Sequence, residues 1–319
     1  GWGSSVPWVP KSLSDPGFRG STAPNHPMRR SLFLLSAAAQ AILTSASRRV
    51  LVTGGNKGIG LQICRRILSD HPDASVILGA RNSGRGEAAV QQLIREDPGN
   101  SGRVEALEID VTNEDSVRAA ANRLREKERA PLYGLVNNAG IGFGYSIPDT
   151  LNTNFYGVKR VCDSFLPLIQ PDGGRIVNIA SASGPNFVRN LGQDEQSLFM
   201  SAETTRDQLE AIIQRYLKSG SSSNAYGLSK ACVNTYTRQL AREHPGLRIN
   251  SCSPGYILTD LTAGMGASTP PEQSNCHVAP LFLLFDELEG NGRYYGSDAV
   301  RSPLHYYRGP GDPPYVADD

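Results

Sequence analysis

Short apolar segments alternate with amphipathic ones from Arg49 onward. The apolar segments are typical of buried β-strands, and the segments between them repeat their apolar positions at helical spacing. We expect strands at residues 50–52, 75–79, 104–109, 132–136, 175–179, 247–251 and 292–296. Strands that alternate with helices predict a doubly wound α/β fold, in which helices cover both faces of a parallel sheet. Such sheets bind ligands at the carboxyl ends of their strands.

The first 48 residues differ in composition from the rest of the chain. They are rich in Ser, Pro and Ala, and Asp15 is their only acid. Met28-Arg29-Arg30 precedes an apolar run from Leu32 to Leu43 that is too short for a confident membrane span. This pattern is typical of a signal or transit peptide, and a disordered extension with no targeting role is the alternative. We therefore expect a leader or extension over residues 1–48 and one domain over residues 49–319.

The composition is that of an ordinary globular protein, with 39% hydrophobic and 20% charged residues and a net charge of +1. Lys and Arg are spread along the chain, which argues against a nucleic-acid partner. The cysteines are far apart and lack metal-ligand spacing, so we expect no metal and interpret them as reduced thiols: Cys64, Cys162, Cys232, Cys252 and Cys276. Reduced thiols favour the cytoplasm, with organelle or secretory targeting by residues 28–48 as the alternative.

A glycine-rich segment, Thr53-Gly54-Gly55-Asn56-Lys57-Gly58-Ile59-Gly60, follows the first expected strand and opens a helix. Backbone N–H groups at a helix N-terminus can hold a pyrophosphate, and glycine lets the phosphate approach closely. The spacing is GxxxGxG, which differs from the GxGxxG of the general dinucleotide-binding motif. Its position in a strand–turn–helix unit predicts a Rossmann-type dinucleotide site.

The end of the second strand indicates which cofactor is bound. An acid there would bind the ribose 2′-hydroxyl of NAD, whereas a nearby Arg suits the 2′-phosphate of NADP. The position of the acid holds Ala80, Arg81 follows it, and Lys57 adds a second cation. We expect NADP(H); the alternative is that both cations are solvated surface residues.

Two further segments carry candidate catalytic groups. Tyr226 and Lys230 are four residues apart on an expected helix, so they share one face. A nearby ammonium favours the phenolate and lowers the phenol pKa, which makes the pair a candidate proton donor. A Tyr packed under a surface Lys is the alternative. Ser181 and Ser183 follow the fifth strand, where a hydroxyl can hydrogen-bond a substrate oxygen.

In their order and spacing these motifs resemble the classical short-chain dehydrogenase/reductase family, from about Arg49 to Gly296. The resemblance implies that Asp110-Val111 contacts adenine and that the segment from Pro254 to Thr259 closes over the nicotinamide. The implied cofactor site consists of Gly54, Asn56, Lys57, Gly58, Ile59, Gly60, Arg81, Asp110, Val111, Asn138, Ala139, Gly140, Tyr226, Lys230, Pro254, Gly255, Ile257 and Thr259.

The resemblance also implies an NADPH-dependent reduction of a ketone or aldehyde, or the reverse oxidation. Tyr226 would protonate the substrate oxygen, and Ser181, with Ser183 as competitor, would polarise it. Lys230 would lower the pKa of Tyr226 and hold the nicotinamide ribose, and Asn154 would bind a water that links Lys230 to solvent. The alternatives are an enone C=C reductase on the same scaffold and a non-catalytic NADP-binding protein.

A segment at about residues 185–223 is inserted before Tyr226. Its apolar positions form one helical stripe, at Leu209, Ile212, Ile213, Tyr216 and Leu217. The insertion resembles that of the carbonyl reductase branch of the family, where the extra helix covers the usual dimer surface. The resemblance implies a monomer that acts on a small carbonyl or alcohol substrate; the alternative for the segment is a mobile surface loop.

Overall fold

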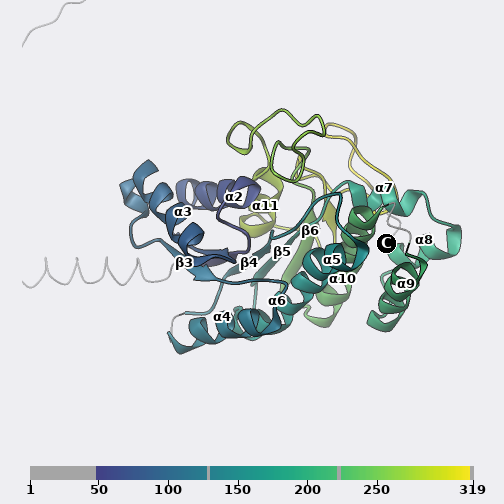
Figure 1. The fold of residues 1–319 in the computed structure, drawn as a ribbon, viewed down its shortest axis with the longest axis horizontal. Coiled ribbons are helices and arrows are strands. Elements are labelled where there is room, and N and C mark those ends of the chain that lie inside the picture. Colours follow the sequence, from purple (N-terminus) through teal and green to yellow (C-terminus); the bar gives the residue numbers. More distant parts are fainter. Residues whose placement is uncertain (1–47, 128–129, 221–223, 317–319) are drawn as a thin grey trace, which may run out of the picture. The chain divides into compact units, whose positions relative to one another are not determined.

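The computed structural model describes residues 48–127, 130–220 and 224–316 (Figure 1). Within this part, seven parallel strands form one sheet in the order β3-β2-β1-β4-β5-β6-β7. The strands are β1 (Arg48–Val52), β2 (Ala74–Ala80), β3 (Val104–Glu108), β4 (Gly134–Asn137), β5 (Arg175–Ile179), β6 (Arg248–Cys252) and β7 (Tyr294–Tyr295). The doubly wound, Rossmann-type three-layer fold that the sequence predicts is therefore confirmed.

Three strands are shorter than the sequence pattern predicts. β3 ends one residue early, at Glu108. β4 begins at Gly134, because Leu132 forms only an isolated bridge with Ile169. β7 ends at Tyr295, because the N–H of Gly296 bonds the carbonyl of Val300 and turns the chain away from the sheet. These differences lie at strand ends, where hydrophobic patterning is least informative.

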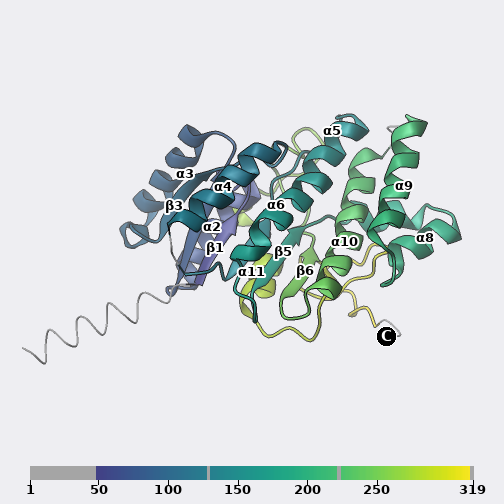
Figure 2. The ribbon, with the colours of Figure 1, turned by 90° about the horizontal axis from the view of Figure 1, so that it is seen from below.

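Helices cover both faces of the sheet, as Figures 1 and 2 show. They are α2 (Gly58–Asp70), α3 (Ser83–Glu96), α4 (Glu114–Glu126), α5 (Ile147–Leu151), α6 (Gly157–Phe165), α7 (Ser183–Arg189), α8 (Gln193–Met200), α9 (Arg206–Ser219), α10 (Ala225–Glu243) and α11 (Val278–Phe285). A π-helical turn, η2 (Asn152–Tyr156), joins α5 to α6, and short 3₁₀ turns are η1 (Pro98–Asn100), η3 (Leu166–Leu168) and η4 (Pro271–Gln273).

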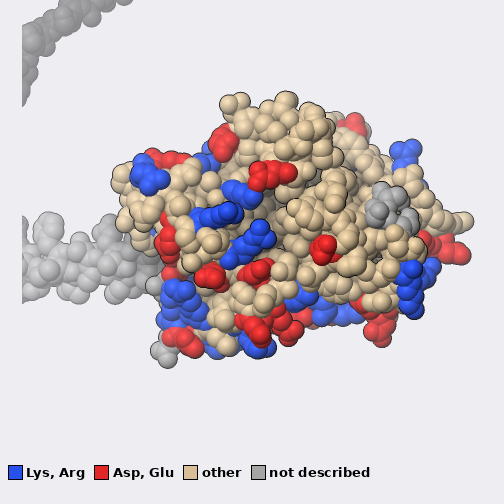
Figure 3. Space-filling model, viewed as in Figure 1, with Lys and Arg blue, Asp and Glu red and all other residues tan. Residues whose placement is uncertain are grey.

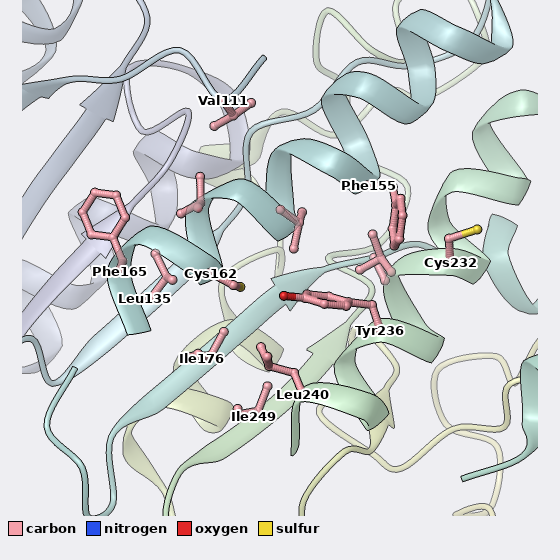
Figure 4. Close-up of a cluster of buried hydrophobic side chains, with 14 of the residues drawn as sticks. Val111, Leu135, Phe155, Cys162, Phe165, Ile176, Cys232, Tyr236, Leu240 and Ile249 are labelled. Atoms are coloured by element: carbon pink, nitrogen blue, oxygen red, sulfur yellow. The ribbon is translucent and has the colours of Figure 1, made fainter. Parts of the chain in front are cut away.

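The two layers of helices bury separate hydrophobic clusters. Alternate residues of β1 point to opposite faces, so Val50 and Val52 join one cluster and Leu51 the other. In the cluster that contains Leu51, Tyr236 and Leu240 of α10 lie over β5 and β6, as Figure 4 shows. This packing fixes α10, whose first turns carry Tyr226 and Lys230, against the sheet.

The insertion is helical and packed, in agreement with the apolar stripe. A capping box between Thr205 and Gln208 starts α9, and Gly220 ends it in the left-handed region with φ 65°. Leu209, Ile212 and Ile213 are buried in the same cluster as the core of α10, with Tyr216 and Leu217 partly buried beside them. Figure 2 shows α9 next to α10. The mobile-loop alternative is therefore wrong.

Except for Arg48, which begins β1, the expected leader or extension over residues 1–48 lies outside the described residues. Among the helices that the structure describes, none is long and apolar enough to cross a bilayer.

A charge introduced into the stripe tests whether this burial stabilises the fold. Ile213 is fully buried, so Ile213→Asp should lower the free energy of unfolding by about 3 kcal/mol or more. Ala211→Asp changes an exposed position of the same helix and is the matched control. Urea unfolding that gives the two variants equal stability would mean that the stripe is not packed against the core.

Candidate active site

The glycine-rich segment forms a tight turn between β1 and α2. Gly54 and Gly58 have φ values of 63° and 57°, in the left-handed region that favours glycine. A Cβ at Gly60 would lie 2.3 Å from the carbonyl oxygen of Gly54 and 2.4 Å from Nδ2 of Asn138, so only glycine fits there. Lys57 at the N-cap has no side-chain acceptor for the first N–H groups of α2. The first backbone N–H groups of α2, including that of Ile59, are therefore available to bind a pyrophosphate, as a dinucleotide site requires.

The segment after β4 is bonded to this loop. Oγ1 of Thr53 accepts the backbone N–H groups of Asn138 at 3.0 Å and Ala139 at 3.1 Å. In return, Nδ2 of Asn138 donates to the carbonyls of Thr53 and Gly54, at 3.0 and 3.1 Å. These contacts join the ends of β1 and β4, the point where the strand order reverses and where doubly wound sheets bind nucleotides.

Basic residues border a pocket on the outer side of the glycine loop. The pocket has a volume of about 440 Å³ and is lined by Asn56, Lys57, Arg85, Ala88, Ala89, Gln92 and Arg95. Arg81 is exposed just before α3, where the sequence analysis expects the 2′-phosphate. Arg85 was not identified from the sequence; its position in the first turn of the helix after Arg81 was the available signal.

Asp110 and Val111 follow β3, separated by one residue from its end at Glu108. Oδ1 of Asp110 accepts the N–H of Thr112 at 2.9 Å and its hydroxyl at 2.7 Å, which fixes the turn into α4. Val111 is buried, and its carbonyl accepts a bond from Arg160 at 3.1 Å. Hydrogen bonds therefore hold this turn in place at the position expected to contact the adenine.

Lys230 is buried in the second turn of α10. Its side chain is only 5% exposed, and Nζ donates to the carbonyl of Ile179 at the end of β5, at 2.8 Å. Burial lowers the pKa of Lys230 to about 8. Nζ lies 5.7 Å from the centre of the Tyr226 ring. The helical spacing therefore brings the two groups together, with the ammonium bonded to the sheet and not to the phenol.

The protonation of Tyr226 differs from the sequence-based expectation. Burial, the larger effect, raises the pKa of Tyr226, and a hydrogen bond with Ser181 acts in the opposite direction. The expected lowering of this pKa by Lys230 is not found, because Nζ is directed at the Ile179 carbonyl. In this structure Tyr226 is consequently a protonated group at neutral pH.

Of the two candidate serines, Ser181 is the one that contacts Tyr226. Ser183 is the first residue of α7, and its backbone N–H donates to Oγ of Ser181 at 3.2 Å. The geometry therefore favours Ser181 over Ser183 as the group that faces a substrate oxygen.

Asn154 lies in the π-helical turn η2, an element that often marks functional sites. Its Oδ1 accepts the N–H of Ile141 at 2.8 Å, and Nδ2 donates to the Ile141 carbonyl at 3.0 Å and to Oγ of Ser229 at 3.1 Å. The Ser229 hydroxyl donates to the carbonyl of Tyr226 at 2.8 Å. Both amide protons of Asn154 are thus used, so a water bound by this residue would need one of its oxygen atoms.

Gly140 lies against Asn154, and the loop that follows it meets the loop after β6. A Cβ at Gly140 would lie 3.1 Å from Oδ1 of Asn154, and one at Gly142 would lie 2.9 Å from the carbonyl of Leu261. Phe143 is 46% exposed and its ring centre lies 4.6 Å from that of Tyr226. An apolar surface therefore borders the Tyr226 ring.

The loop after β6 also reaches the glycine loop. It contains Pro254, Gly255, Ile257 and Thr259; a Cβ at Gly58 would lie 3.5 Å from Cγ2 of Thr259. Figure 1 shows this loop in the same region as α2. The segment that is expected to close over the nicotinamide thus lies over the phosphate-binding turn.

Comparison with known proteins extends over most of the chain. Residues 48–192 match the family model described as short chain dehydrogenase, and residues 211–283 match the one described as enoyl-(acyl carrier protein) reductase. Carbonyl reductase (NADPH) 3 from Rattus norvegicus is 36% identical over 287 residues, which cover 82% of this chain and 100% of that protein. Carbonyl reductase (NADPH) 1 from Homo sapiens is 37% identical over 285 residues, 81% of this chain and 99% of that protein.

Solved structures of two reductases also align with most of the chain. Salutaridine reductase from Papaver somniferum aligns with a TM-score of 0.67 and 27% identity, over 78% of this chain and 99% of that one. Menthone neomenthol reductase from Mentha piperita aligns with a TM-score of 0.65 and 28% identity, over 79% and 99%.

The low pKa of Lys230 predicts a measurable cost to stability. Below about pH 8 the lysine is charged in the folded and unfolded chains, and its burial costs the fold roughly 3 kcal/mol, the equivalent of a pKa that falls from 10.5 to about 8. Lys230→Met removes this charge but leaves the Ile179 carbonyl without its hydrogen bond. The free energy of unfolding of the variant should therefore exceed that of the wild type by about 1–2 kcal/mol at about pH 7.

Because the folded-state pKa lies below the unfolded one, this gain should be lost as the pH rises from about 8 to about 10.5. Urea unfolding of both proteins across this range isolates Lys230, since the other titrating groups are common to both. A variant that is less stable than wild type at about pH 7, or a gain that grows with pH, would contradict the assigned burial cost.

Proposed function

The chain belongs to the short-chain dehydrogenase family, and from this we propose that it reduces ketone or aldehyde carbonyls with NADPH, or oxidises the corresponding alcohols. The observation that carries the proposal is the meeting of Ser181, Tyr226 and Lys230 at the carboxyl edge of the sheet, beside the glycine loop. Relatives that match over four fifths of the chain are named as NADPH carbonyl reductases, which supports the same substrate and cofactor class.

The cofactor would be held at the carboxyl ends of β1 and β4, where the strand order reverses. When bound, NADPH supplies the hydride. We propose that it is held by Gly54, Asn56, Lys57, Gly58, Ile59, Gly60, Arg81, Asp110, Val111, Asn138, Ala139, Gly140, Tyr226, Lys230, Pro254, Gly255, Ile257 and Thr259.

Side chains of the protein supply the proton that the substrate oxygen takes up. Ser181 hydrogen-bonds the substrate oxygen, and Tyr226 donates its phenolic proton to the same oxygen. A raised pKa keeps Tyr226 protonated at neutral pH, which suits a proton donor in the direction of reduction. Loss of that proton would leave a phenolate. For Lys230 to stabilise it, Nζ would have to leave the Ile179 carbonyl, to which it donates in this structure. Asn154 holds the start of α10 through Ser229 and the Tyr226 carbonyl, and a water on Asn154 would return the proton from solvent.

The two alternatives make different predictions. The match of residues 211–283 to an enoyl reductase model keeps the C=C reductase in view, but Tyr226 in contact with Ser181 is suited to protonating an oxygen. Following NADPH oxidation with a panel of ketones, aldehydes and enones separates them. Alcohol products support the proposal, saturated ketones support the enone reductase, and NADPH binding without turnover supports a binding protein.

Arg81 should set the preference for NADPH over NADH. Arg81→Glu removes a charge-assisted phosphate contact and adds repulsion, so the ratio of kcat/KM for NADPH to that for NADH should fall by at least about tenfold. Arg125→Glu makes the same charge change on the exposed side of α4 and should leave the ratio unaltered. An Arg81 variant with the wild-type ratio would show that the 2′-phosphate assignment is wrong.

We also propose that residues 49–319 form one NADP-binding domain that is monomeric. The support is that α9 packs on the chain's own core next to α10, so a symmetric dimer through this face would have to expel the insertion. Light scattering that finds a stable dimer at micromolar concentration would contradict the monomer. The five buried, unpaired cysteines support a reducing compartment, for which we propose the cytoplasm.

A further inference from the structure

One ion pair connects the glycine loop with the loop after β6. Lys57, the N-cap residue of α2, is bonded through Nζ to the carboxylate of Asp260, 203 residues later in the chain. The side chains are 63% and 75% exposed, so the pair lies open to solvent. Thr259, next to Asp260, lies against Gly58. The pair therefore spans the phosphate-binding turn from one side to the other.

The same lysine faces the basic pocket. Lys57 lines that pocket together with Arg85 and Arg95. Figure 3 shows basic side chains gathered on this face, around the places where Figure 1 labels α2 and α3, with acidic side chains beside them. In the described part of the chain, Arg81 and Arg85 form no ion pair, whereas Lys57 is bonded to a carboxylate. A phosphate that enters this region therefore meets Lys57 already bound to an anion.

We propose that Asp260 is a specificity-determining residue for the cofactor, because its carboxylate competes with the cofactor's phosphate for Lys57. This inference rests on the proposed use of NADP(H). Binding exchanges one anion on Lys57 for another, so Asp260 weakens binding and favours release. The exchange also removes one of the contacts between the loop after β6 and the glycine loop, which couples cofactor occupancy to the position of that loop.

The expected effect is modest, since an exposed ion pair contributes little by itself. Removing the competing charge with Asp260→Asn should tighten NADPH binding roughly 3- to 5-fold at low ionic strength. The gain should shrink at high salt, because the competition is between exposed charges. NADH lacks the 2′-phosphate, so its affinity should change less.

The experiment measures the Kd of NADPH and NADH by calorimetry for wild type, Asp260→Asn, Lys57→Met and the double variant. If Asp260 acts through Lys57, then adding Asp260→Asn to Lys57→Met should leave the Kd of NADPH unchanged. Asp172→Asn removes an exposed acid before β5, at the opposite edge of the sheet, and is the control for net charge.

Each outcome decides the inference. Tighter NADPH binding in Asp260→Asn that disappears in the Lys57→Met background supports it. Unchanged or weaker binding, or a gain that persists without Lys57, overturns it while leaving the proposed function intact. A wild-type protein that binds no NADPH would overturn both, so the two failures are distinguishable.

Discussion

The buried ammonium of Lys230 is the constraint on which the active-site end of the sheet depends. A buried charge is costly unless it is hydrogen-bonded, and the partner here is the carbonyl of Ile179 at the end of β5. That bond fixes the distance between α10 and the sheet at the level of Tyr226. Burial lowers the pKa of Lys230 to about 8, so keeping this cation beside the phenol lowers the stability of the fold.

A buried polar chain behind the site keeps α10 in register. Nδ2 of Asn137 on β4 donates to Oδ1 of Asn178 on β5 at 2.8 Å, and Nδ2 of Asn178 donates to Oγ1 of Thr237 on α10 at 2.9 Å. Buried amides lose free energy when a partner is missing, so these bonds specify one alignment of strand, strand and helix. A second pair of hydrogen bonds positions the active site: Asn154 donates to the Ser229 hydroxyl, which donates to the carbonyl of Tyr226.

The features that could be predicted from the sequence are those that depend on local residue spacing. The sheet, the position of the glycine turn and the stripe of α9 follow from spacing, because burial of one face repeats at the period of the element. The features that the sequence did not indicate depend on where side chains meet in space. Burial of the phenol raises the pKa of Tyr226, where the sequence predicts a lowering by Lys230, and the Lys57–Asp260 pair depends on the path of a long loop.

The most direct test of the account is a single-turnover measurement on Tyr226→Phe with bound NADPH and a ketone that the wild type reduces. The variant keeps the ring beside Phe143 and loses only the hydroxyl. We predict that NADPH still binds and that the rate of NADPH oxidation falls by at least about 100-fold. Tyr145→Phe, an exposed tyrosine in the loop after β4, should retain the wild-type rate. A Tyr226→Phe protein that reduces the ketone at full rate would contradict the proton-donor assignment.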